Sequence, residues 1–118
     1  MGIRSVVNLR LEDNSETEHV MAAGMRPRHI PVVDWSVPTV EQVAEFIRFV
    51  RDPENGPVLV HCLGGVGRTG IMVTCWRVAQ GIDAHVALDL NEEEIAFSGL
   101  SLTSEQRQFV LDWAHFFK

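Results

Sequence analysis

The stretch HCLGGVGRTG, residues 61–70, places a thiol and a guanidinium on either side of a glycine-rich segment. Five residues separate Cys62 from Arg68, and three of them are glycines. Glycines let the backbone curl so that successive N–H groups point inward, and such a ring of donors holds an anion. The guanidinium of Arg68 offers paired N–H donors that fit two oxygens of one phosphate. The spacing therefore predicts a loop that binds a tetrahedral oxyanion with a thiol at its base.

Cys62 is predicted to be the nucleophile of this loop. The inward amides and the N-terminus of a following helix favour the thiolate, which is the reactive form of cysteine. A thiolate directly behind a bound phosphorus can displace an alcohol or a phenol in line, and water must then hydrolyse the cysteinyl phosphate. The hydroxyl of Thr69 is expected to donate a hydrogen bond to the departing sulfur, although Thr69 could also be only the first residue of the helix.

The leaving group of such a reaction needs a proton, and a carboxylic acid on a loop can supply it, with an effect of ~10²–10⁴ on rate. Asp34 is the first candidate because it follows a predicted strand and precedes Trp35 and Pro38 in a loop. Asp13, which follows the first predicted strand, is the reserve candidate. A purely structural turn residue is the alternative interpretation of Asp34.

Strands and helices alternate along the chain, and they must bring these residues together. Runs of strand formers predict strands over residues 5–9, 29–33 and 58–62, the last of them central in the sheet. Pro31 favours an edge or irregular position for the second strand. Helical spacing predicts helices over residues 15–24, 39–52, 69–81 and 83–97 and from residue 103 onward. This alternation predicts one α/β domain over residues 1–118, with a mostly parallel sheet that binds ligands beyond the carboxyl ends of its strands.

Apolar residues at helical spacing indicate which faces of these helices are buried. Two helices are expected to open with a capping box, Thr39 with Gln42 and Thr103 with Gln106. The apolar faces of these two helices are predicted to hold Val40, Val43, Ile47 and Val50, and Phe109, Trp113 and Phe116. The helix at 69–81 is apolar nearly all round, so it is predicted to be buried, with Cys75 as a core side chain.

Composition limits the partners and the compartment. The 118 residues are 46% hydrophobic and 22% charged, which is the balance of one globular domain. The net charge of −6 repels nucleic acids and anionic membrane surfaces, so neither is expected as a partner. Two cysteines cannot build a disulfide framework, which favours the cytoplasm. The five histidines lack metal-ligand spacing, so no metal site is expected.

The same stretch matches His-Cys-x5-Arg-Ser/Thr-Gly, the signature of the cysteine-based protein tyrosine phosphatases. The segments GIRSVVNLR, IPVVDWSVPT and TSEQRQFVLDW resemble, in order, parts of the small dual-specificity branch of that family. The resemblance covers nearly the whole chain. It implies the phosphatase fold without the segment that usually precedes the first strand, a monomeric enzyme, and no metal or organic cofactor.

The resemblance also implies a role for each matching residue. Cys62 corresponds to the nucleophile, Asp34 to the general acid, and Thr69 to the hydroxyl that assists breakdown of the intermediate. His61 corresponds to the residue that supports the loop. The phosphate loop, by the same resemblance, consists of Leu63, Gly64, Gly65, Val66, Gly67 and Arg68.

Departures from the family pattern bear on the substrate. The chain has no tyrosine, and Leu102 stands where larger members carry a water-positioning glutamine, while Gln106 aligns with a second family glutamine. Both features imply a shallow pocket of the dual-specificity type. The loop letters LGGVG contain no lysine, which argues against inositol lipids. The implied substrates are phosphotyrosine in proteins, with phosphoserine and phosphothreonine as further candidates, or a small phosphomonoester.

Two other functions fit parts of the pattern. A phosphate-binding module without turnover would keep the loop and lose the chemistry. A sulfurtransferase would use a reactive cysteine loop, but it would not need Asp34 or the Arg68–Thr69 pair.

Overall fold

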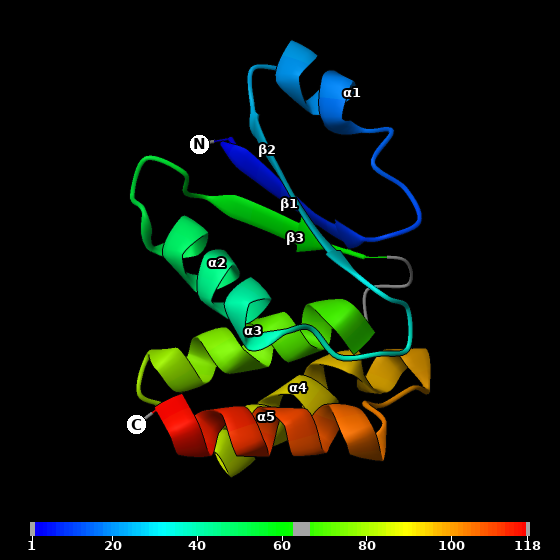
Figure 1. The fold of residues 1–118 in the computed structure, drawn as a ribbon, viewed down its shortest axis with the longest axis vertical. Coiled ribbons are helices and arrows are strands. Elements are labelled where there is room, and N and C mark those ends of the chain that lie inside the picture. Colours follow the sequence, from blue (N-terminus) through cyan, green and yellow to red (C-terminus); the bar gives the residue numbers. More distant parts are fainter. Residues whose placement is uncertain (1, 63–66, 118) are drawn as a thin grey trace.

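The computed structural model describes residues 2–62 and 67–117, which alternate between strands and helices (Figure 1). The elements are, in order, β1 (Ser5–Arg10), α1 (Thr17–Ala22), β2 (Arg26–Val32), α2 (Val40–Arg51), β3 (Val58–His61), α3 (Gly67–Ala79), α4 (Ala84–Ile95), a short 3-10 helix η1 (Ala96–Ser98) and α5 (Ser104–Phe117). This order confirms the predicted α/β class. Helix α1 packs on β2, while the other α-helices lie on the opposite side of the sheet.

The described strands form one parallel sheet in the order β2-β1-β3. The prediction that the strand at 58–62 is central is wrong, because β1 pairs with both neighbours and β3 lies at an edge. The different burial of β1 and β3 agrees with β1 in the centre and β3 at the edge. Residues 5–9 of β1 are all buried, whereas Leu59 in β3 is 45% exposed. Pro31 lies in β2, an edge strand, as its missing N–H predicts.

Parallel strands place all their carboxyl ends at the same edge of the sheet. Here β1 ends at Arg10, β2 at Val32 and β3 at His61. The segments that follow these strands therefore meet on one side of the molecule, on the right of Figure 1. This edge carries the residues singled out for chemistry.

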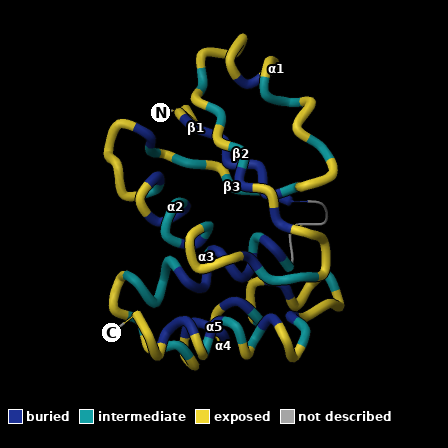
Figure 2. Tube along the Cα trace, viewed as in Figure 1, coloured by how far each residue is buried: buried dark blue, intermediate teal, exposed yellow. Residues whose placement is uncertain are grey.

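Helix α3 lies between the sheet and the helices α4 and α5 (Figure 1). None of its residues is exposed, and Figure 2 shows its trace as buried or intermediate along its length. The predicted buried helix is thus confirmed. Cys75 is fully buried in it, and burial raises the pKa of this thiol to about 12, as expected of a core side chain.

Both predicted capping boxes are present, but the buried faces of their helices differ from the prediction. Thr39 and Gln42 cap α2 reciprocally, and Thr103 and Gln106 do the same for α5. The buried residues of the two helices are Val43, Phe46, Ile47 and Phe49 in α2, and Gln106, Val110, Trp113 and Ala114 in α5. The predicted core positions Val40 and Phe116 are 58% and 83% exposed.

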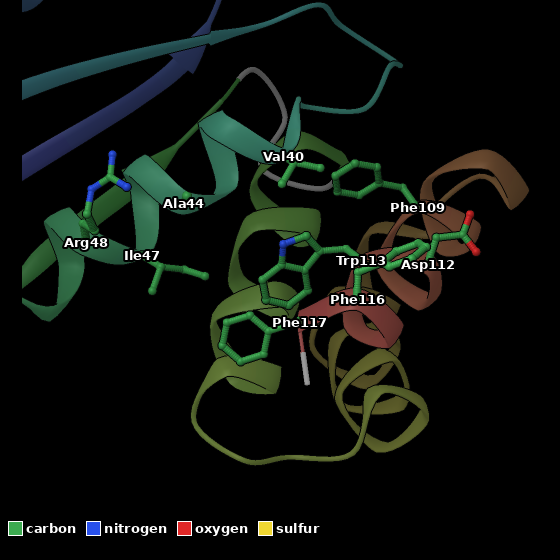
Figure 3. Close-up of a pocket in the computed structure, with 9 residues that line it drawn as sticks. All are labelled: Val40, Ala44, Ile47, Arg48, Phe109, Asp112, Trp113, Phe116 and Phe117. Atoms are coloured by element: carbon green, nitrogen blue, oxygen red, sulfur yellow. The ribbon is translucent and has the colours of Figure 1, made fainter.

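An open groove between α2 and α5 explains these two exposed positions (Figure 3). It has a volume of about 700 Å³ and a largely apolar lining, formed by Val40, Ala44, Ile47, Arg48, Phe109, Asp112, Trp113, Phe116 and Phe117. Helix α5 packs on α3 rather than on α2. Val40 and Phe116 therefore line the groove instead of entering the core.

The contrast between the two kinds of phenylalanine gives a stability prediction. Phe46 is 2% exposed, so Phe46→Ala should lower the free energy of unfolding by ~3–5 kcal/mol, because it leaves a cavity in the core. Phe116→Ala, the matched control at the groove, should change it by less than about 0.5 kcal/mol. Denaturant titration measures both variants. Equal losses would contradict the open groove.

Candidate active site

Cys62 directly follows the last residue of β3, at the carboxyl edge of the sheet. Cys62 is 9% exposed, and the hydroxyl of Thr69 donates a hydrogen bond to its sulfur over 3.1 Å. Thr69 stands in the first turn of α3, so the start of this helix is directed at the thiol. Two residues that the sequence predicts to cooperate are therefore in contact.

The predicted phosphate loop is described only in part. Leu63, Gly64, Gly65 and Val66 lie outside the described residues. Gly67 is described, and a Cβ atom at this position would come within 3.0 Å of the amide nitrogen of Gln106. That amide nitrogen also donates to the carbonyl of Ser36 over 3.3 Å. The buried Gln106 thus lies between the end of the phosphate loop and the segment that carries Asp34.

Arg68 is the most buried cation of the site, with 1% of its side chain exposed. Its Nη1 donates to Oε1 of Glu12 over 2.8 Å, and its Nη2 donates to Oε2 of the same carboxylate over 3.1 Å. Nη1 also donates to the carbonyl of Val32 over 3.0 Å. Moving even a neutral polar group out of water without a hydrogen-bond partner costs ~2–7 kcal/mol, and burying a charge also costs several kcal/mol. The buried guanidinium therefore needs these partners.

Glu12 is a residue that the sequence reasoning missed. Its position after β1 was a usable signal, because the same reasoning selected its neighbour Asp13. The hydrogen bond from Arg68 lowers the pKa of Glu12 from 4.5 to about 2, and the same bond raises the pKa of Arg68. Asp13 binds within its own segment, where it accepts from the N–H of Ser15 and pairs with Arg10.

Asp34 lies at the same edge, two residues after the end of β2. Its Oδ1 is 3.4 Å from Nη2 of Arg68 and accepts a hydrogen bond from the N–H of Trp35. The side chain is 48% exposed, so its carboxylate is open to a bound molecule. Trp35 has a φ of 63°, in the left-handed region that a tryptophan rarely adopts. This bend turns the chain directly after the candidate acid.

His61 precedes Cys62 and contacts a second missed carboxylate. Its Nε2 lies 2.6 Å from Oε1 of Glu16, the residue that precedes α1. Both side chains are a little over a quarter exposed. Glu16 stands in a predicted helical segment, where nothing in the sequence marks it as a partner of His61.

The chain that brings Cys62, Thr69, Arg68 and Asp34 to one sheet edge is similar to proteins of a known family. A family model described as a DSP-PTPase phosphatase fused to NAD+ kinase matches residues 1–111. The chain belongs to the dual-specificity branch of the cysteine-based protein tyrosine phosphatases. The resemblance drawn from the sequence is confirmed.

The curated relatives named here are longer proteins than this chain. The chain is 32% identical over 116 residues to an Arabidopsis thaliana protein named phosphatidylinositol 3,4,5-trisphosphate 3-phosphatase and protein-tyrosine-phosphatase PTEN1, and the match covers 92% of the chain but 27% of that protein. It is also 32% identical over 78 residues to the tyrosine-protein phosphatase cdc-14 of Caenorhabditis elegans, which covers 66% of the chain and 11% of that protein. The chain therefore spans well under half of either relative.

Solved structures share the fold over nearly the whole chain. The crystal structure of Tk-PTP in the active form has a TM-score of 0.83 and 28% identity, over 96% of this chain and 79% of that chain. The core catalytic domain of the PP-IP phosphatase SIW14 from S. cerevisiae has a TM-score of 0.77 and 20% identity, over 92% of this chain and 65% of that one. The second likeness shows the fold alone.

Within residues 2–62 and 67–117, no three His, Cys, Asp or Glu side chains are grouped so that they could hold a metal ion. Among the described helices, none has the length and apolar character that a membrane span requires.

The ion pair between Glu12 and Arg68 predicts a pH-dependent stability. Because the folded-state pKa of Glu12 is depressed, its carboxylate stabilises the fold above about pH 4.5, and this contribution disappears as the pH falls from about 4.5 to about 2. Glu12→Gln should therefore be less stable than the wild type at neutral pH. The difference should close towards pH 2. Unfolding at a series of pH values measures it, and a difference that stays constant down to pH 2 would contradict the pairing.

Proposed function

We propose that residues 1–118 form one phosphatase domain that hydrolyses phosphomonoesters through a cysteinyl-phosphate intermediate. The observation that carries this proposal is the meeting of Cys62 and Arg68, from one segment, with Asp34, from a segment distant in the sequence, at one sheet edge. The backbone of residues 63–68 and the Arg68 guanidinium hold the phosphate. His61 supports the loop beside the nucleophile.

The first half of the proposed reaction forms the intermediate. The Cys62 thiolate attacks phosphorus, a sulfur–phosphorus bond forms, and the bond from phosphorus to the ester oxygen breaks. The carboxyl group of Asp34 gives its proton to that oxygen, so the product leaves as an alcohol or a phenol. The half-exposed position of Asp34, 3.4 Å from Arg68, supports this role.

The second half releases inorganic phosphate. Water attacks phosphorus, its proton passes to the Asp34 carboxylate, and the sulfur–phosphorus bond breaks. The hydrogen bond from the Thr69 hydroxyl stabilises the sulfur as it leaves as a thiolate. Each step uses side chains of this chain and water, so the proposed reaction needs no metal and no organic cofactor.

The favoured substrates are phosphotyrosine proteins, with phosphoserine and phosphothreonine as further candidates. Val33 and Trp35, which flank Asp34, are 56% and 66% exposed, and such an apolar surface suits an aromatic ring. Glu12 and Asp34 make the same edge acidic, and the loop letters LGGVG add no cation. This charge disfavours a substrate with several phosphates. The proposed enzyme is a cytoplasmic monomer that binds neither nucleic acid nor membrane.

Turnover of an artificial aryl phosphate tests the reaction class. The wild type should release the phenol in the presence of a chelator, vanadate should inhibit it, and Cys62→Ser should reduce turnover to background because the nucleophile is lost. Cys75→Ser, in the core, is the matched control and should retain activity if it folds. A wild type that binds phosphate but stays inert between pH 5 and pH 8 would instead identify a phosphate-binding module.

Leaving-group dependence tests the role of Asp34. Asp34→Asn should lower kcat by ~10²-fold or more for a poor leaving group such as an alkyl phosphate, because that oxygen needs a proton. An activated nitrophenyl ester should lose much less. Steady-state kinetics with both esters, and with Asp13→Asn as the control, measure the difference. Equal losses on the two esters would remove Asp34 from the acid role.

A further inference from the structure

The segment between β1 and α1, residues 11–16, runs along the same sheet edge as the candidate active site (Figure 1). Its path is fixed by polar contacts of its own. The amide of Asn8 donates to the carbonyl of Asp13 over 2.7 Å and accepts from the N–H of Arg10 over 3.0 Å. The Asp13 carboxylate in turn accepts from the N–H of Ser15 over 2.8 Å. A segment held in this way can present its other side chains in defined directions.

Two of those side chains, Glu12 and Glu16, reach the two ends of the signature sequence. Glu16 contacts His61, the residue before the nucleophile, and Glu12 contacts Arg68, the last residue of the phosphate loop. The partners are 45 and 56 residues apart in the sequence. One short segment therefore holds both flanks of the loop that binds the phosphate.

Glu12 competes with a phosphate only if both need the same N–H groups of Arg68. A carboxylate across Nη1 and Nη2 occupies the outer edge of the guanidinium, and the carbonyl of Val32 takes the other hydrogen of Nη1. The Nε–H remains, together with the second hydrogen of Nη2, an atom that also has Oδ1 of Asp34 3.4 Å away. Nε is buried, and no hydrogen-bond partner is found for it in the described part of the chain.

The remaining Nε–H and Nη2–H lie side by side on the lateral edge of the guanidinium, where they can donate to two oxygens of one phosphate. Glu12 thus fixes the guanidinium by its outer edge and leaves the lateral edge for the ligand. An ionised carboxylate suits this position because it only accepts hydrogen bonds. A glutamine would turn an NH₂ donor towards one guanidinium nitrogen.

The contact with Glu16 fixes the neighbouring imidazole in the same way. A carboxylate cannot donate, so the Nε2 atom of His61 carries a hydrogen that points at Glu16. The ring is thereby held next to the backbone of Cys62. In the sheet, His61 is the register partner of Asn8, which lies on the strand that leads into residues 11–16.

We propose that Glu12 and Glu16 are positioning residues for the phosphatase reaction, and this inference rests on the proposed function. Glu12 orients the lateral N–H pair of Arg68 towards the phosphate. Glu16 orients His61 and, through it, the nucleophile Cys62. Glu12 acts on phosphate binding and Glu16 acts on the nucleophile, so their variants should differ in whether KM or kcat changes.

Glu12→Gln tests the first half of the inference. It should weaken the binding of inorganic phosphate by about tenfold and raise KM for an aryl phosphate by a similar factor, as expected when a charged hydrogen-bond pair is lost. Calorimetric titration with phosphate and steady-state kinetics measure the two effects. Glu18→Gln, at an exposed position on α1, is the matched control and should behave as the wild type.

Glu16→Gln tests the second half. It should lower kcat by about tenfold, because the loss of one positioning contact costs about that factor, and leave phosphate affinity within about twofold of the wild type. A role in folding alone would instead move the unfolding midpoint and leave the kcat of the folded enzyme unchanged. That result would overturn the assignment of Glu16.

Three results would overturn the assignment of Glu12. Unchanged phosphate affinity in Glu12→Gln would show that it does not orient Arg68, and tighter affinity would show that it competes with the ligand. Should Glu12→Gln unfold, Glu12→Asp decides instead: its shorter carboxylate reaches one Nη, so an intermediate loss of affinity is expected, and wild-type affinity overturns the proposal. A wild type without turnover would defeat the proposed function, while phosphate titration would still test Glu12.

Discussion

The charge of Arg68, placed where almost no water reaches it, is the constraint on which the rest of the site depends. A buried guanidinium is stable only when acceptors replace the water that it loses, because the loss of its hydration costs several kcal/mol. Glu12 and the carbonyl of Val32 supply these acceptors, and Asp34 lies 3.4 Å from the same cation. The acceptors come from the ends of two strands, so the cation can be buried only when those strands pair correctly.

The parallel sheet turns this constraint into a reactive site. Because β1, β2 and β3 end at one edge, their following segments deliver a carboxylate, a candidate acid and a thiol to the same place. Helix α3 begins at that edge, and its first turn brings the Thr69 hydroxyl to the sulfur of Cys62. The start of one helix thus lies beside the sulfur of Cys62, where its N–H groups favour a thiolate or a bound anion, and this arrangement fits the proposed chemistry.

The helical layer supports the site from beneath. Gln106, buried in α5, lies so close to Gly67 that a Cβ atom there would be 3.0 Å from its amide nitrogen, and that nitrogen also donates to the carbonyl of Ser36. Its position links the phosphate loop to the segment of the candidate acid. The groove between α2 and α5 lies outside this framework, since α5 packs on α3 and leaves the face towards α2 open.

The sequence by itself determined the elements and the candidates for the reactive residues, because both depend on local information. Strand formers, capping boxes and the spacing from Cys62 to Arg68 are written within short windows, and the structure has the helices and strands close to where those windows predict them. Which strand is central, which side of α5 is covered and which carboxylate pairs with Arg68 depend on contacts between distant segments. Only the tertiary structure selected Glu12, because the pairing joins residues 56 positions apart and nothing local distinguishes it from Asp13.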